Sequence, residues 1–287
     1  MKAGRAGSIP DDVLSTTKVH SQALHSLLQE IGPAVFYMNT SVVGLHAVEE
    51  GYPKPDTLDV SWAPRNQKCA ARETRKFILE SVMVRASETI NQFIAAVSVL
   101  PSFEDVRKKW DSYTSVAERL TSVATAALDK DDYLIPAAVL LVHWRNRVVH
   151  PSSNAKLAAR QKRILLNNMD IISQEYRDLN VIRLLSHFDE QRPTLKDISC
   201  LIAMTINLAR KIDRTIQSNL SKPELEAWLD HYELRPMLKK IEAETSPEKY
   251  KASVCRHFKS RAPYLLESYL LHYDPDAPQS TSLDQHS

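Results

Sequence analysis

Residues 133–151 read YLIPAAVLLVHWRNRVVHP, and this stretch decides the expected fold class. The apolar run 134–142 is far too short to span a bilayer. It is apolar nearly all round a helix, so we expect it to lie in the core of a helical protein. Pro151 should end the helix, because proline breaks the backbone hydrogen-bond pattern.

The last turn of this predicted helix is rich in polar groups. Arg145, Asn146 and Arg147 follow the apolar run, and His150 stands directly before the proline. Polar groups at the end of a core helix must be hydrogen-bonded or must face a partner. Arg145 and His150 are five residues apart and would diverge on a regular helix. Since a residue before proline is pushed out of the α region, we expect His150 to turn toward Arg145.

Helical patterns continue on both sides of this segment. Apolar residues recur every three or four positions in most of the chain, and the clearest stripe runs from Leu195 to Ile216. The predicted helices cover about 11–30, 34–48, 67–99, 103–127, 133–149, 155–184 and 195–216, with short helices beyond 221. The proline-containing segment 51–66 reads as a loop. The sequence therefore predicts an all-α protein, a helical bundle with additional N- and C-terminal helices.

Composition divides the chain into four predicted parts. Residues 1–66 form an N-terminal helical extension and loop, and residues 67–220 form the helical core. Residues 221–273 hold the small C-terminal helices. Residues 1–10 and the polar tail 274–287 are predicted to be disordered.

Glycine and cysteine usage exclude several classes of site. The chain has five glycines and none follows Gly51, so no phosphate-binding glycine loop, dinucleotide fingerprint or nucleophile elbow can occur beyond it. The cysteines at 69, 200 and 255 form no C-x-x-C metal or redox pair, and their odd number argues against a disulfide framework and fits a reducing compartment. The N-terminus turns polar before any signal-like apolar run. We therefore expect a cytoplasmic protein without a membrane partner.

Charge is distributed unevenly along the chain. The net charge is only +2, yet no Asp or Glu occurs between Tyr133 and Met169. The same stretch holds six lysines and arginines, which is a pattern that suits a phosphate backbone. We expect Arg147, Lys156 and Arg160 to contact RNA. The alternative is a basic helix face that is merely solvated.

The motif at the end of the core helix resembles a known family. Arg145-Asn146-Arg147-Val148-Val149-His150 is similar to the R-x4-6-H signature of the HEPN superfamily, including the polar residue after the arginine. The all-helical context and the helix after the motif are similar too. The resemblance covers about residues 67–220.

This resemblance implies a metal-independent endoribonuclease that needs no cofactor. Arg145, Asn146 and His150 would be the catalytic residues, acting on RNA whose own 2′-hydroxyl attacks the adjacent phosphorus. An imidazole suits proton transfer near neutral pH. A guanidinium can stabilise a phosphoryl group that gains charge. Asn146 would orient the histidine or the phosphate.

The resemblance also implies partners. One histidine cannot readily act as base and acid on opposite sides of one phosphorus, and the chain has one motif. A homodimer with a composite site would supply the second copy. Proteins of this type serve as toxins or in antiviral defence, and an antitoxin or regulatory protein would restrain them.

Two other functional hypotheses remain open. The first is a non-catalytic HEPN-like module that binds RNA, a nucleotide or a protein. The second is a structural helical scaffold in which the motif occurs by chance.

Other polar or aromatic residues carry weaker signals. His187, Asp189 and Glu190 match no standard metal-site spacing and are more typical of a helix end. His143 is interpreted as a core histidine. Trp144 is the one tryptophan that we place near the site.

Overall fold

The computed structural model describes residues 20–217 and 220–273. Within these ranges every regular element is helical and no strand occurs, which confirms the all-α prediction. The predicted disorder of residues 1–10 and 274–287 falls outside the described residues. No helix of the described chain is long and apolar enough to cross a bilayer.

Most of the helices follow one another with short connections, but a long loop joins α1 to α2, as the sequence predicts. Those of the N-terminal half are α1 (Gln22–Glu49), α2 (Gln67–Ser98), α3 (Glu104–Lys108), α4 (Val116–Ala127) and α5 (Leu134–Val149). Next come α6 (Ala159–Asn167), α7 (Met169–Glu175), α8 (Val181–Asp189) and α9 (Leu195–Gln217). The C-terminal group is α10 (Lys222–His231), α11 (Leu234–Glu244), α12 (Pro247–Arg261) and α13 (Leu266–Tyr273).

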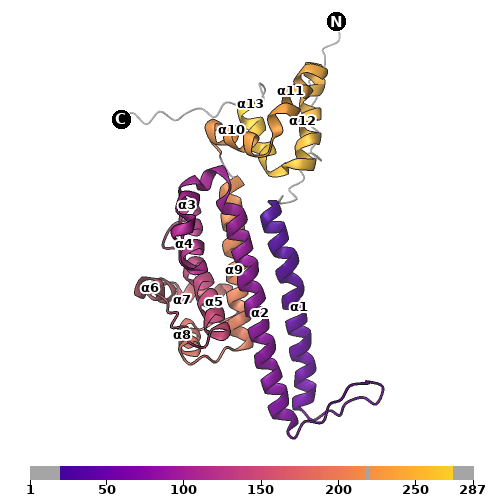
Figure 1. Cartoon of the computed structure of the whole chain (residues 1–287), viewed down its shortest axis with the longest axis vertical. Helices are drawn as coiled ribbons and strands as arrows, with labels where there is room; N and C mark the ends of the chain where they lie inside the picture. Colours follow the sequence, from indigo (N-terminus) through magenta and orange to yellow (C-terminus); the bar gives the residue numbers. More distant parts are fainter. Residues whose placement is uncertain (1–19, 218–219, 274–287) are drawn as a thin grey trace.

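Helix α2 lies at the centre of the long bundle. It packs along α1 on one side and against α4, α5 and α9 on the other, while α10–α13 gather beyond the end of α9 (Figure 1). Buried apolar side chains form one continuous core from α1 to α13. Helix α5 is its most buried element, with Ala137, Leu140, Leu141 and Val142 fully enclosed. The core therefore fixes the position of the polar turn that ends α5.

The N-terminal helix differs from its prediction. Two helices were expected, at about 11–30 and 34–48, but α1 continues through Pro33 and Gly44 as a single helix. Ion pairs Glu49–Arg72 and Glu30–Arg85 hold it along α2. Tertiary packing outweighs the low helix propensity of glycine and β-branched residues here.

The segment 103–127 is also broken where one helix was expected. Short helical turns end near Ser112, and α4 begins after Ser115, whose hydroxyl accepts the Glu118 backbone N–H. The Glu118 carboxylate in turn accepts the Thr114 backbone N–H at 2.7 Å. This reciprocal capping starts a new helix and stops the preceding one from continuing.

The predicted helix 155–184 is three helices, α6, α7 and α8. Arg177 and Asp178 have φ values of 53° and 55°, a left-handed conformation that ends the run. The Asn180 side chain then caps α8 by accepting the Arg183 backbone N–H. The resulting turn places α8 against the end of α5.

Candidate functional site

The end of α5 departs from helical geometry where the sequence predicts it. His150 is the C-cap residue, with φ −124° and ψ 91°, so its backbone is extended. Its N–H still donates to the Asn146 carbonyl at 2.9 Å, and its side chain is exposed. The prediction that Pro151 displaces the preceding residue from the helix is confirmed.

Asn146 connects the two ends of the motif. Its side-chain Oδ1 accepts a hydrogen bond from Arg145 Nη1 at 3.2 Å, while its backbone carbonyl accepts the His150 N–H. The Asn146 side chain therefore contacts the guanidinium, and only the backbone links Asn146 to His150.

The Arg145 guanidinium has an acidic partner that the local sequence does not contain. Nη2 lies 2.5 Å from Glu88 Oε1 of α2, and the Arg145 side chain is 21% exposed. Its Nε is buried without a hydrogen-bond partner among the described residues. The stretch around the motif is free of acids in the sequence, but the fold brings the Glu88 carboxylate of α2 against Arg145. An incoming phosphate would compete with Glu88 for this guanidinium.

Arg147 is placed differently from the prediction. It is 8% exposed, and its guanidinium donates to the carbonyls of Ala155 and Phe188 at 2.9 and 2.7 Å. It also lies 3.8 Å from the centre of the Phe188 ring. Arg147 thus braces α5 against α8 and the loop after Pro151, and the expected RNA contact is not supported for this buried side chain.

Some of the other cations between Tyr133 and Met169 form ion pairs with acidic residues outside that stretch. Arg160 Nη2 lies 2.6 Å from Asp131, and this hydrogen bond lowers the pKa of the Asp131 carboxyl. Lys162 pairs with Asp189 at 3.7 Å. Lys156 is exposed and forms no ion pair within the described residues. Of the three predicted RNA contacts, Lys156 is the one whose charge is most available.

His143 lies two turns before His150, beside a shallow open pocket. The pocket has a volume of about 520 Å³ and is also lined by Glu118, Lys156 and Gln161. Burial, together with the charge of Arg147, lowers the pKa of His143 and favours its neutral form. Its Nδ1 is buried without a hydrogen-bond partner in the described chain. His143 is therefore more enclosed than His150, but it is only partly buried and lines the pocket, which differs from a hydrogen-bonded core histidine.

Trp144 belongs to the core rather than to the site. It is 1% exposed, and its ring meets the edge of Phe188 at 5.5 Å between centroids. Trp144 is next to Arg145 in the chain, as the prediction that it lies near the site requires, but the preceding apolar turns of α5 keep its ring inside. Its contact with Phe188 helps to hold α8 beneath the motif.

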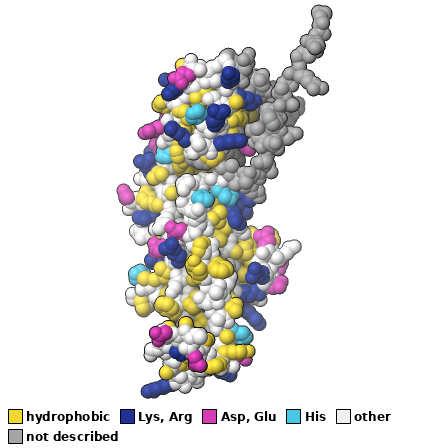
Figure 2. Space-filling model, turned by 90° about the vertical axis from the view of Figure 1, so that its right-hand side faces the viewer, with side chains coloured by type: hydrophobic (Ala, Val, Ile, Leu, Met, Phe, Trp, Pro, Cys, Tyr) yellow, Lys and Arg dark blue, Asp and Glu magenta, His cyan; other side chains and the backbone are white. Residues whose placement is uncertain are grey.

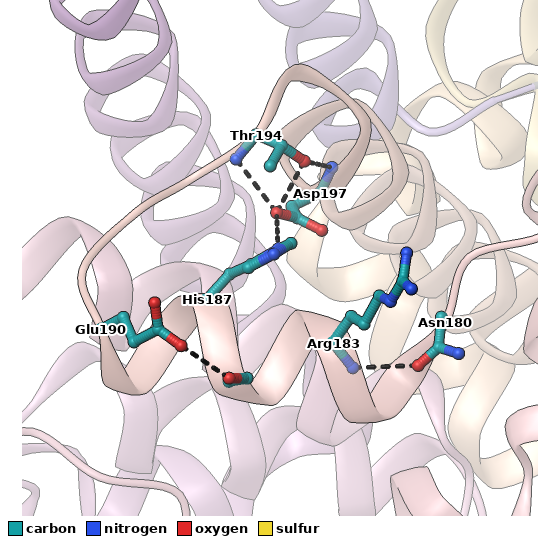
Figure 3. Close-up of polar contacts among 7 residues, drawn as sticks. Asn180, Arg183, His187, Glu190, Thr194 and Asp197 are labelled. Carbon is teal, nitrogen blue, oxygen red and sulfur yellow. Dashed lines mark hydrogen bonds and ion pairs between the residues drawn. The ribbon is translucent and has the colours of Figure 1, made fainter.

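A histidine–aspartate pair that the sequence reasoning missed lies next to this region. His187 Nδ1 is 2.8 Å from Asp197 Oδ2, and the same oxygen accepts the Thr194 N–H and hydroxyl (Figure 3). Asp197 is 3% exposed, so α9 supplies a buried carboxylate to α8. The capping box of α9 was a usable signal for Asp197. Nothing near His187 in the sequence indicated that the two helices meet.

His187, Asp189 and Glu190 do not converge on one point, as ligands of one metal ion would. His187 turns toward Asp197, while Glu190 accepts the Ser186 hydroxyl (Figure 3). Asp189 pairs with Lys162. No group of three potential metal ligands occurs in the part of the chain that the structure describes. The cluster is best described as a helix-end network.

Comparisons with known proteins add no assignment. No family model, curated protein or solved structure matches this chain.

Proposed function

We propose that the chain is a metal-independent endoribonuclease whose site is the turn at the end of α5. The observation that carries the proposal is that the end of α5 holds a partly exposed guanidinium, Arg145, in contact with Asn146, and an exposed histidine, His150, at the C-cap outside the helix. Phosphoryl transfer through a 2′-hydroxyl needs proton transfer and stabilisation of negative charge, and an imidazole and a guanidinium can supply these.

In this mechanism each side chain has one role. Arg145 binds a phosphate oxygen and stabilises the charge that develops as the 2′-oxygen attacks phosphorus. Asn146 holds the guanidinium through its Oδ1. His150 takes up or delivers a proton at the same phosphate, and Lys156 contacts a neighbouring phosphate. The reaction closes a 2′,3′-cyclic phosphate and releases the 5′-oxygen with a proton.

The proposal includes a homodimer with a composite site. Each chain holds one such motif, whereas proton removal and delivery occur on opposite sides of the phosphorus. Val149, 41% exposed beside the exposed His150, leaves apolar surface next to the motif for a second subunit. We further propose that the enzyme acts as a toxin or in antiviral defence and that an antitoxin or regulatory protein restrains it.

One observation favours the non-catalytic alternative. Glu88 forms an ion pair with Arg145, so the arginine could have a structural role in a module that only binds RNA, nucleotide or protein. The two hypotheses differ in what happens to RNA: the binding module leaves it uncleaved, and the enzyme cleaves it.

The test is cleavage of total RNA by the purified full chain in the presence of EDTA. We expect Arg145→Ala and His150→Ala to lose cleavage at least about a hundredfold, as for loss of an acid–base group. Matched controls are Arg72→Ala, an exposed arginine that pairs with Glu49, and His25→Ala, an exposed histidine of α1. Both controls should cleave like the wild type. Cleavage that needs a metal ion and survives His150→Ala would overturn the proposal.

A further inference from the structure

A polar hollow lies between helix α6 and the loop that joins α4 to α5. Its volume is about 550 Å³. Three of the residues that line it are cations, Lys130, Arg160 and Arg163, and one is an acid, Asp131. The whole chain has a net charge of only +2, yet this hollow alone is lined by two more positive charges than negative ones.

The three cations lie close enough together to act on one carboxyl group. Arg160 Nη2 donates to Asp131 Oδ1 at 2.6 Å, and this hydrogen bond is the main cause of the lowered pKa of Asp131. The charges of Lys130 and Arg163 lower the pKa of the same carboxyl further. Lys130 and Arg163 are exposed and form no ion pair among the described residues. Their charges therefore remain available to an anion.

Two neighbouring acids are engaged elsewhere and do not line the hollow. Asp129 Oδ1 accepts the Asp131 backbone N–H at 2.9 Å. Asp132 pairs with Lys211 of α9 at 2.9 Å, and it also accepts the Leu134 backbone N–H at the start of α5. The hollow thus keeps its excess of positive charge.

The hollow is suited to a phosphate group and not to a nucleobase. A guanidinium offers a fork of donors to phosphate oxygens, and an ammonium group binds a phosphate as a point charge. No aromatic ring lines the hollow, and its one apolar residue, Ile164, is 8% exposed. A base would find no ring to stack on. Contacts of this kind hold a strand without reading its sequence.

The α1 side of the molecule offers a phosphate backbone much less. From Ile31 to Val48 the chain has no Asp, Glu, Lys or Arg. Figure 2 shows this side, where hydrophobic side chains lie along the middle of the face. Helix α6 lies on the opposite side of the bundle from α1 (Figure 1). Positive charge therefore draws a phosphate backbone to the α6 side.

We propose that the hollow binds a backbone phosphate of the RNA substrate at a distance from the bond that is cleaved, an inference that rests on the proposed function. The hollow lies at the N-terminal end of α5 and His150 at the C-terminal end. Since α5 has 16 residues, the two are about 24 Å apart along the helix. A stacked strand advances about 3.4 Å per nucleotide, so about seven nucleotides span this length.

The experiment is fluorescence anisotropy of labelled 2′-O-methyl RNA, which the proposed reaction cannot cleave. Two strands of unrelated sequence, each of about twelve nucleotides, are titrated with the full chain at several salt concentrations. The variants are Lys130→Gln and Arg163→Gln, which remove a positive charge, and Asp131→Asn, which removes the negative one. Matched controls lie in the C-terminal helices: Lys240→Gln replaces an exposed lysine of α11, and Asp230→Asn an exposed carboxylate that pairs with Arg235.

Lys130→Gln and Arg163→Gln should each raise the Kd about three- to tenfold, equally for both sequences. Each should also reduce the slope of log affinity against log salt by about 0.7, the value for one phosphate contact on a single strand. Asp131→Asn should lower the Kd by a similar factor, because Arg160 is released and one negative charge is lost. A purely structural role of these residues would not tighten binding. Both controls should bind like the wild type.

Several results would overturn the inference. They are a wild type that does not bind the strands, hollow variants that bind like the wild type or no more weakly than Lys240→Gln, and an Asp131→Asn chain that binds more weakly. A melting temperature that inorganic phosphate raises more than chloride of equal ionic strength, lost in Arg163→Gln while RNA affinity is unchanged, would indicate a site for free phosphate instead.

Cleavage of unmodified RNA by the same proteins separates this inference from the proposed function. If the wild type cleaves RNA but the hollow variants bind it normally, the hollow alone is ruled out. If the variants change binding as expected but no RNA is cleaved, the ribonuclease proposal fails and the phosphate site stands.

Discussion

Glu88→Gln tests how the Arg145 guanidinium is held. The substitution keeps the shape of the side chain and its carbonyl oxygen but removes the charge. Arg145 is 21% exposed and Glu88 45%, so solvent screens the pair, and we assign it about 1 kcal/mol rather than the value of a buried pair. The free energy of unfolding should therefore fall by at most about 1 kcal/mol.

The same substitution should strengthen binding to RNA. In the wild type a phosphate competes with Glu88 for Arg145, and release of about 1 kcal/mol corresponds to about fivefold tighter binding. The assay is fluorescence anisotropy of a short labelled RNA in EDTA, in a His150→Ala background that prevents cleavage. Glu49→Gln is the control, because Glu49 pairs with Arg72 and Arg75 near the other end of α2.

Two outcomes would refute this reasoning. If Glu88→Gln weakens RNA binding as much as Arg145→Ala does, Glu88 positions the guanidinium instead of competing for it. If neither substitution changes binding, Arg145 does not touch the RNA.

Three further predictions follow from the same structure. Arg147→Ala should lower the free energy of unfolding by about 3 kcal/mol in thermal or urea unfolding, because two carbonyls and the Phe188 ring lose a charged donor. Burial raises the pKa of the Asp213 carboxyl, so the folded protein loses stability as the pH rises and this carboxyl ionises. Asp213→Asn should therefore have a higher melting temperature than the wild type at neutral pH. The difference should disappear below about pH 3.5, where the carboxyl is protonated in both the folded and the unfolded state. In a mixture of Arg145→Ala and His150→Ala chains, a composite dimer should regain part of the RNA cleavage, whereas a site made within one chain should regain none.

The local part of the site could be predicted from the sequence. Proline after His150 dictates an extended backbone at that residue, and the apolar run before Arg145 dictates a buried helix. Both effects act between neighbours in the chain. The same reasoning explains the correct bounds of α2, whose stripe is regular and whose end is marked by Pro101.

The contacts between helices could not be predicted in this way. Glu88 is the only charged residue between Arg85 and Glu104, which is a usable signal for a special role, but its partner lies 57 residues further along the chain. Arg147 was expected at the surface because it is a cation in a basic stretch. Only the packing of α8 shows that the Phe188 carbonyl is there to receive it.

The end groups of the cleaved RNA test the central proposal most directly. Purified wild-type chain is incubated with total RNA in EDTA beside His150→Ala, and the new 3′ ends are identified by mass spectrometry. The mechanism predicts 2′,3′-cyclic phosphate ends from the wild type, none from His150→Ala, and no cleavage of 2′-O-methyl RNA. Products that carry 5′-phosphate and free 3′-hydroxyl ends, or cyclic ends that persist in His150→Ala, would contradict it.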